Sequence, residues 1–124
     1  MFFNVSNHPS AKWSELQLAA AHDLGGEFIR DIQFPDVPAT ADEGWVTRKA
    51  YDLVRSLSLT MGDVVMVQGE MTLTFAIVAR VLFASNVQCV AACSSRVVTE
   101  SVNDKGETVK TATFAFAGFR RYVM

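Results

Sequence analysis

Two kinds of hydrophobic pattern follow each other along the chain. Short apolar runs, typical of strands buried in a sheet, are separated by segments in which apolar residues recur at helical spacing. The predicted strands are residues 1–5, 27–34, 64–68 and 88–93, the second of which alternates only in part, as expected near a sheet edge. The predicted helices begin at about Ser14, Asp42 and Leu73 and end near Gly25, Leu57 and Ser85.

This order of elements predicts an α/β fold in which helices cover both faces of a parallel sheet. Right-handed crossovers leave few topologies for such a chain. The commonest is a Rossmann-like sheet with the strands in the order 2-1-3-4. Its switch point, where ligands bind in sheets of this kind, then lies between the ends of the first and third strands.

The last part of the chain has a different pattern. Two alternating segments flank Asn103-Asp104-Lys105-Gly106, which is a hairpin turn signal. These segments are residues 97–102 and 108–116. We therefore expect a single domain over residues 1–124, with a βα core at 1–96 and a C-terminal β-hairpin and tail at 97–124.

Polar side chains follow the first strand directly. Ser6, Asn7, His8 and Ser10 can each hydrogen bond to a phosphate, a ribose hydroxyl or a base edge. The loop leads into a helix N-terminus, which favours anions. Pro9 restricts His8 to extended conformations, so we expect the imidazole to be held in place. The alternative is an ordinary βα loop with polar filler.

A second polar loop, residues 69–74, follows the third strand and should meet the first loop at the switch point. Gly69 lets the backbone turn closely against a ligand, and Met71 is also a candidate ligand contact. Thr72 or Thr74 can cap the helix or offer a hydroxyl. Glu70 could orient the imidazole, accept a ribose hydroxyl or act as a base. Alternatively, Glu70 merely complements the helix dipole in its first turn.

Ser94-Ser95-Arg96 follows the fourth predicted strand on the same rim of the sheet. Arg96 is the candidate to hold a phosphate bidentately, and Ser94 and Ser95 add hydroxyls. Arg120 and Arg121 could supply more charge, although only one of them can face the site in an alternating strand. We expect both of these arginines to be solvated.

The segment from Leu73 to Phe83 is apolar around most of its circumference. Packing on a sheet uses one stripe of a helix, so a second apolar face, with positions such as Val78 and Leu82, needs another cover. The same helix of a second subunit in a two-fold homodimer would provide it. Alternatively, the C-terminal hairpin folds over this face.

Composition and net charge exclude some classes of function. Half of the 124 residues are apolar and 19% are charged, which also suggests that a partner covers some apolar surface. A net charge of −2 argues against bulk DNA or RNA binding, which needs a basic face. We recognise no signal peptide and no apolar stretch long enough to span a membrane. The expected location is the cytoplasm.

The two cysteines, Cys89 and Cys93, fall in one predicted strand. Four residues along a strand place them roughly 13 Å apart on one face, too far to pair with each other. No His or Asp nearby has metal-ligand spacing. We therefore interpret them as core thiols of a cytosolic protein and expect no metal and no cofactor.

Taken together, these segments resemble small ancillary proteins of type III CRISPR loci, stand-alone relatives of the CARF (CRISPR-associated Rossmann-fold) domain. The resemblance spans nearly the whole chain in pattern, through short motifs. They are Ser6-Asn7-His8-Pro9-Ser10, Trp13-Ser14 before a Gln-bearing helix, Phe34-Pro35, Gly69-Glu70-Met71-Thr72 and Phe119-Arg120-Arg121-Tyr122.

The resemblance implies binding of a cyclic oligoadenylate, because these proteins bind such messengers and several cleave them as ring nucleases. It implies attack of a ribose 2′-OH on the adjacent phosphate without a metal, with His8, Glu70 and Arg96 as the candidate catalytic residues. A two-fold dimer would match a two-fold cyclic ligand such as cyclic tetra-adenylate. Three hypotheses stay open: a degrading enzyme, a non-catalytic sensor or sponge, and an unrelated protein that binds another nucleotide or phosphorylated metabolite.

Overall fold

The computed structural model describes residues 1–84 and 86–124 and contains a five-stranded sheet. The strands, in the spatial order β2-β1-β3-β4-β5, are β2 (Ile29–Gln33), β1 (Phe2–Ser6), β3 (Val64–Val67), β4 (Gln88–Val102) and β5 (Thr108–Arg121). The first four are parallel, and β5 pairs antiparallel with β4. The α/β class is confirmed, and the observed sheet differs in detail because β5 joins its edge as a fifth strand.

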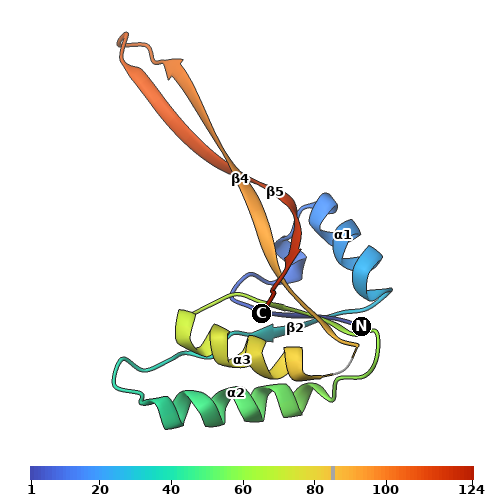
Figure 1. Cartoon of the computed structure of the whole chain (residues 1–124). Coiled ribbons are helices and arrows are strands. Elements are labelled where there is room, and N and C mark those ends of the chain that lie inside the picture. Colours follow the sequence, from blue (N-terminus) through green and yellow to red (C-terminus); the bar gives the residue numbers. More distant parts are fainter. Residues whose placement is uncertain (85) are drawn as a thin grey trace.

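Helices cover both faces of the sheet (Figure 1). On one side lies α1 (Glu15–Gly25), preceded by a short 3₁₀ turn at Ser10–Lys12, and on the other lie α2 (Glu43–Leu57) and α3 (Met71–Phe83). Alternation along β1 divides its side chains between two cores. Phe3 and Val5 pack with residues of α2 and α3, whereas Phe2 packs with residues of the α1 layer.

Local sequence signals set the ends of the helices. The Ser14 hydroxyl accepts a hydrogen bond from the Gln17 amide at 3.2 Å and caps α1, as the capping-box pattern indicates. Gly26, with φ of 88°, ends the same helix. The Asp42 carboxylate accepts a hydrogen bond from the Trp45 amide at 2.8 Å and caps α2. None of the α-helices in the described residues is long and apolar enough to cross a membrane.

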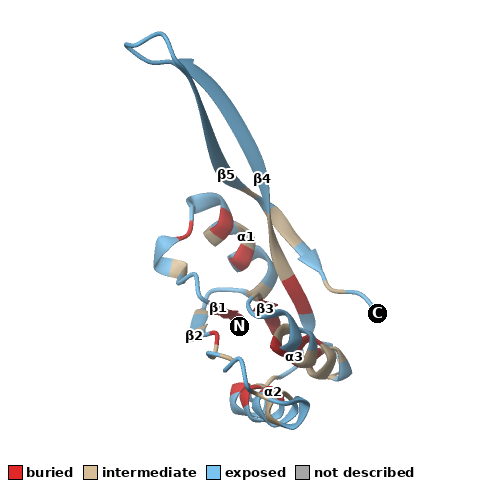
Figure 2. Cartoon of the chain, turned by 90° about the vertical axis from the view of Figure 1, so that its left-hand side faces the viewer, coloured by how far each residue is buried: buried red, intermediate tan, exposed pale blue. Residues whose placement is uncertain are grey.

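The fourth strand is longer than its sequence pattern predicted. It does not end at Cys93 but continues to Val102, and its register against β5 shifts between Cys93 and Ser94, where β5 has one extra residue. Beyond the bulge, residues 94–116 form an arm that projects from the domain and is almost wholly exposed (Figure 2). Ser94, Ser95 and Arg96 therefore lie in the root of this arm and not at a strand end, which corrects the prediction.

The two faces of α3 also differ from the prediction in detail. Leu73, Ile77, Val78 and Val81 are buried, so Val78 packs in the core, although it also lines the groove beside α3 together with Leu82. The exposed face carries Met71, Phe75 and Phe83. The hairpin does not fold over this face, because the arm points away from α3 (Figure 1). The last residues of the chain lie beside it instead and line a groove of about 720 Å³ with α3.

Candidate functional site

A cavity of about 750 Å³ opens where β1 and β3 end, between the N-terminus of α1 and the root of the arm. Its walls combine hydroxyl, amide and basic side chains with two phenylalanines. The lining residues are Ser6, Asn7, His8, Lys12, Ser14, Gln17, Met66, Gln68, Gly69, Ala92, Ser94, Phe114 and Phe116. This is the switch point that the topology predicts.

A buried hydrogen-bond network shapes the loop after β1. Asn4, 1% exposed, donates from Nδ2 to the His8 carbonyl and to Asp31 Oδ1, each at 2.9 Å. Its Oδ1 accepts the Ser6 hydroxyl at 2.6 Å. Trp13 Nε1 adds a second donor to the His8 carbonyl at 3.0 Å. The loop conformation is therefore fixed by polar groups that have few other hydrogen-bond partners in the core.

His8 lies on this loop with its backbone held and its side chain exposed. Its amide donates to the Ser6 hydroxyl at 3.1 Å, and its carbonyl accepts hydrogen bonds from Asn4 and Trp13. The imidazole lines the cavity and makes no hydrogen bond to the residues that the structure describes. It is thus placed in the cavity by the backbone and free to meet a ligand.

Ser10 has a structural partner instead of a place in the cavity. Its hydroxyl donates to Asp31 Oδ2 at 2.9 Å, and its amide also donates to that carboxylate. Asp31 lies on β2, so these bonds anchor the loop to the edge of the sheet. Ser10 therefore anchors the loop and lies outside the cavity lining.

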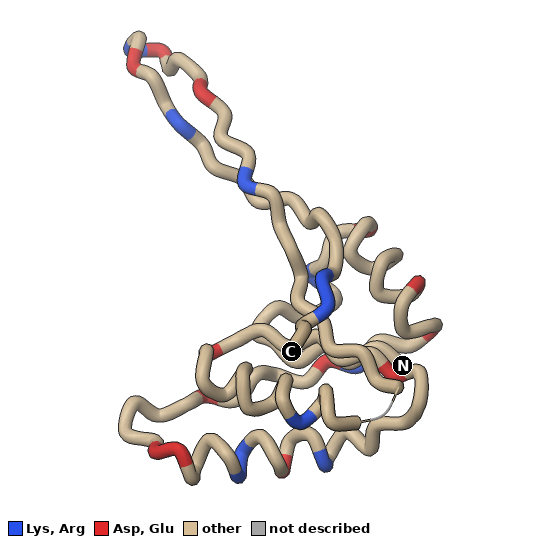
Figure 3. Tube along the Cα trace, viewed as in Figure 1, with Lys and Arg blue, Asp and Glu red and all other residues tan. Residues whose placement is uncertain are grey.

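The charge of the cavity favours an anion. Within the described part of the chain, its lining contains the cation of Lys12 and the imidazole of His8 but no carboxylate. Outside the cavity, basic and acidic residues are interspersed along α2 and at the tip of the arm, without a basic stripe (Figure 3). The root of the arm and the end of β5 add the exposed cations of Arg96, Arg120 and Arg121 outside the lining. This distribution of charge suits a small anionic ligand.

Gly69 lies at the end of β3 and lines both the cavity and the groove beside α3. Sequence reasoning assigned this glycine to ligand approach, but a protein group already takes up the space above its Cα. A Cβ built at Gly69 would lie 2.5 Å from Cδ1 and Cδ2 of Phe34, which is 3% exposed. Gly69 is therefore required by the packing of Phe34.

Glu70 is the N-cap of α3 and does not line the cavity. Its carboxylate accepts hydrogen bonds from the amides of Thr72, at 2.9 Å, and Leu73, at 2.8 Å, and from the Thr72 hydroxyl. These bonds, the one from Leu73 foremost, lower the pKa of Glu70. The geometry matches the capping alternative, and it corrects the prediction that Glu70 lies beside His8.

The remaining predicted residues separate into two groups. Met71 and Thr74 line the apolar groove and not the cavity, while the Thr72 hydroxyl is used by Glu70. Ser94 lines the cavity, whereas alternation places Ser95 on the other face of the arm. The structure therefore brings together Ser6, Asn7, His8, Gly69 and Ser94.

Arg96 stands just outside this group. It is exposed and lies opposite Phe114, on the same face of the arm as Ser94, but it does not line the cavity. Arg120 and Arg121 are exposed and also lie outside the lining, as expected. Arg96, the residue predicted to bind a phosphate, lies beyond the cavity because β4 continues past the edge of the sheet.

Sequence reasoning missed several residues of the cavity. Lys12 gives little signal as a lone lysine. Gln17, which is 7% exposed, stands three residues after Ser14, and this capping-box spacing explains a glutamine there without a ligand. Gln68 bridges to β4, donating to the Ala92 carbonyl at 3.3 Å and accepting from the Ala92 amide at 3.0 Å. A polar residue inside an apolar strand, such as Asn4, was the signal that could have indicated the loop network.

Comparison with known proteins adds a family and no function. A family model described as "Uncharacterized protein MJ1673 family" matches residues 1–120. No curated protein and no solved structure gives a significant match. The matched range includes every residue that lines the cavity.

Proposed function

The chain belongs to the uncharacterized protein MJ1673 family, and we propose that its cavity binds a cyclic oligoadenylate, most specifically cyclic tetra-adenylate, and cleaves it. In this proposal the protein switches off type III CRISPR signalling in the cytoplasm. The free thiols of Cys89 and Cys93 suit that reducing compartment. The proposal rests on the resemblance of the sequence motifs and on the chemistry of the cavity.

The observation that carries the proposal is the composition of the switch-point cavity. Lys12 and His8 line it together with hydroxyl and amide groups, and its lining contains no carboxylate among the residues that the structure describes. A phosphodiester needs a cation and neutral hydrogen-bond donors, and a ribose needs hydroxyl or amide partners. The cavity volume of about 750 Å³ is in the range of small-molecule sites.

Cleavage requires few groups. A ribose 2′-oxygen attacks the adjacent phosphorus, the P–O5′ bond breaks, and the products are a 2′,3′-cyclic phosphate and a 5′-hydroxyl. One proton leaves the 2′-oxygen and one is gained by the 5′-oxygen, so a single imidazole can serve as base or acid. His8 supplies that imidazole, and Lys12 stabilises the charge that develops on the phosphate.

The second candidate function is a sponge that binds the same ligand without cleaving it. Two observations favour the sponge: Glu70 is engaged as a helix cap, and Arg96 lies outside the cavity lining. Of the three residues predicted to be catalytic, His8 lines the cavity, whereas Glu70 and Arg96 do not. Binding by Lys12 and the loop amides needs neither of the displaced residues.

Incubation with cyclic tetra-adenylate, with and without EDTA, separates these functions. Chromatography of the products should show linear fragments ending in a 2′,3′-cyclic phosphate, at equal rates in both conditions. Retention of intact ligand selects the sponge. Failure to retain or convert the ligand contradicts both and leaves the third hypothesis, another nucleotide or a phosphorylated metabolite.

Lys12→Ala should weaken binding of cyclic tetra-adenylate more than Arg96→Ala does. A charge-assisted hydrogen bond to phosphate contributes about 1.5–3 kcal/mol, so Lys12→Ala should raise the Kd by at least tenfold. Arg96→Ala should raise it by less, because Arg96 lies outside the lining. Titration calorimetry measures both variants, and the reverse order would show that the arm bends to bring Arg96 onto the ligand.

The proposal includes a homodimer through α3. Met71, Phe75 and Leu82 line the apolar groove with Val123 and Met124. The groove shares Gln68 and Gly69 with the cavity, so the two surfaces are adjacent. A two-fold contact on this face would therefore place two cavities close to one another, as a two-fold cyclic ligand requires.

Phe75→Glu should convert this dimer into a monomer. Phe75 is 78% exposed on α3, so the variant keeps the fold while it places an unpaired charge in an apolar interface. Sedimentation at micromolar concentration measures the change. Leu16→Glu, at a residue 72% exposed on α1, is the matched control and should leave the dimer intact. A wild-type monomer would contradict the interface.

A further inference from the structure

The bulge at the root of the arm decides which side chains of β5 face the cavity. Phe119 pairs with Ala92 and Phe116 pairs with Ser94, so β5 has one extra residue, Ala117, between these pairs. In a regular strand Phe119 and Phe116 would lie on opposite faces. The extra residue places Phe116 on the Phe119 face, and their rings lie 5.0 Å apart.

Phe116 belongs to a chain of aromatic rings that begins in the core. Phe119 contacts Phe2 at 5.1 Å between centroids, and Phe2 contacts Trp13 at 6.0 Å. Phe114 is the next residue of β5 on the same face, and it lines the cavity although it is 72% exposed. A large exposed aromatic ring thus stands at the cavity wall beyond a row of packed rings.

Gln17 is the second unusual group of the cavity. It is 7% exposed, lines the cavity from α1, and its side-chain amide makes no hydrogen bond to any residue in the described part of the chain. The other amides differ, because Gln68 is bonded to Ala92 at both ends. The amide atoms of Gln17 are not fully buried, so they are accessible from the cavity and can meet a polar group of a ligand there.

We propose that Phe114 and Gln17 form a base-recognition subsite for adenine. This inference rests on the proposed function and assigns the base, as distinct from the phosphate, to a position in the cavity. Figures 1 and 2 show α1, which carries Gln17, beside the root of the arm, which carries Phe114. The base stacks on the Phe114 ring, and the Gln17 amide pairs with N6 and N7 of its edge.

The chemistry of each group selects this ligand. A phenylalanine ring stacks on any base, so Phe114 provides affinity without discrimination. A glutamine amide offers one donor and one acceptor side by side, which match N7 and the N6 amino group of adenine. Hypoxanthine presents two acceptors at the same edge, so the amide can satisfy only one of them.

Calorimetric titration of cyclic tetra-adenylate into the full chain, with every variant carrying His8→Ala so that the ligand is not cleaved, tests the stacking. Phe114→Ala should weaken binding by about 5- to 100-fold, the range found for loss of one stacked base, and Phe114→Trp should retain it. Phe28→Ala is the control, because Phe28 is 64% exposed and lies outside the lining, and it should change nothing. Unchanged affinity of Phe114→Ala would overturn the subsite.

The edge contact is tested with AMP and IMP. The wild type should prefer AMP by about tenfold, and Gln17→Met, which keeps the length of the side chain, should lose this preference. An equal preference in Gln17→Met and wild type would overturn the role of Gln17. Thermal unfolding of the variant in the absence of nucleotide shows whether a weaker affinity comes from loss of fold.

The outcomes separate this inference from the proposed function. If Lys12→Ala weakens binding of cyclic tetra-adenylate and Phe114→Ala does not, the subsite is wrong and the function stands. If the wild type ignores the cyclic ligand but binds AMP in a manner that depends on Phe114, the function is wrong and the subsite stands. If no adenine nucleotide binds, both are wrong.

Discussion

His8→Ala should lower the rate of cyclic tetra-adenylate cleavage by roughly 10²–10⁴-fold, the usual contribution of a positioned acid or base. The ring lines the cavity, and the loop that carries it is held through the His8 backbone, not through the imidazole. The variant should therefore keep its fold and most of its affinity. Single-turnover product analysis gives the rate, and titration calorimetry gives the affinity.

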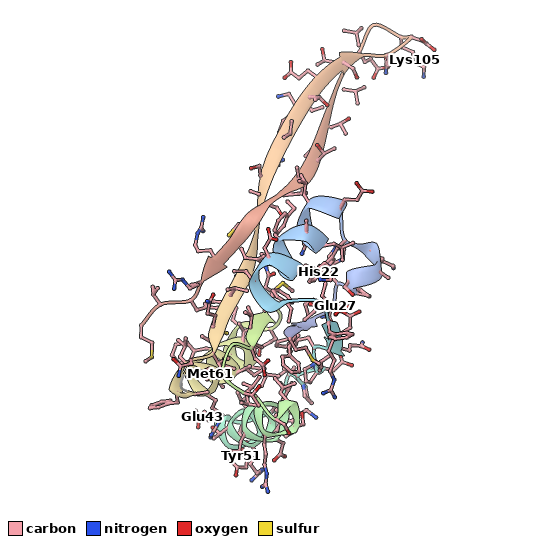
Figure 4. All side chains as sticks on the ribbon, turned by 90° about the vertical axis from the view of Figure 1, so that its right-hand side faces the viewer. His22, Glu27, Glu43, Tyr51, Met61 and Lys105 are labelled. Atoms are coloured by element: carbon pink, nitrogen blue, oxygen red, sulfur yellow. The ribbon has the colours of Figure 1, made fainter. Side chains whose placement is uncertain are left out.

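Two controls accompany this variant. His22→Ala should cleave at the wild-type rate, because His22 is exposed on α1 (Figure 4). Its ring contacts the Gly26 carbonyl at 2.8 Å and does not line the cavity. Glu70→Gln should have a smaller effect on the rate than His8→Ala, since Glu70 caps α3. A His8→Ala protein that cleaves at the wild-type rate would mean that catalysis rests on alignment alone.

Gly69→Ala should destabilise the fold by about 1–3 kcal/mol, the cost of adding a methyl group to a well-packed core. The new Cβ would lie 2.5 Å from two ring carbons of Phe34, whose ring is buried and has little room to move. Because Gly69 also lines the cavity, the same change should weaken ligand binding. Urea unfolding measures the loss of stability.

A second substitution and a matched glycine test the cause. Adding Phe34→Leu to Gly69→Ala should cost less than the sum of the two single changes, because the smaller side chain relieves the contact. Gly44→Ala should stabilise the protein by up to about 1 kcal/mol, since Gly44 lies in α2 and a Cβ there meets only Asp42 Oδ1 at 3.5 Å. Equal effects at both glycines would contradict the role of Phe34.

The parts of the fold set by local patterns could be predicted from the sequence. The Ser14 cap, the Gly26 stop and the order of the parallel strands follow from spacing and from crossover handedness. The arm could not be predicted in this way. The apolar run to Cys93 and the alternating run from Val97 resemble two strands, and only pairing with β5 makes them one. The extra residue of β5, Ala117, cannot be recognised in the pattern of apolar and polar residues.

The candidate site also contains residues that the local sequence predicts and residues that it does not. The loop after β1 was predicted because polar residues directly follow a buried strand at a switch point. Glu70 was misplaced because a carboxylate that caps a helix and one that faces a ligand occupy the same position in the sequence. Gln17 and Phe114 enter the cavity from elements far apart in the chain, so their meeting depends on tertiary packing.

The most direct test of the central claim is to locate the bound ligand by titrating ¹⁵N-labelled protein with cyclic tetra-adenylate. The account predicts saturable shifts of the amide signals of Ser6, His8, Gly69 and Ser94, which line the cavity, and unchanged signals along α2. The absence of shifts, or shifts confined to the groove at Val123 and Met124, would contradict it.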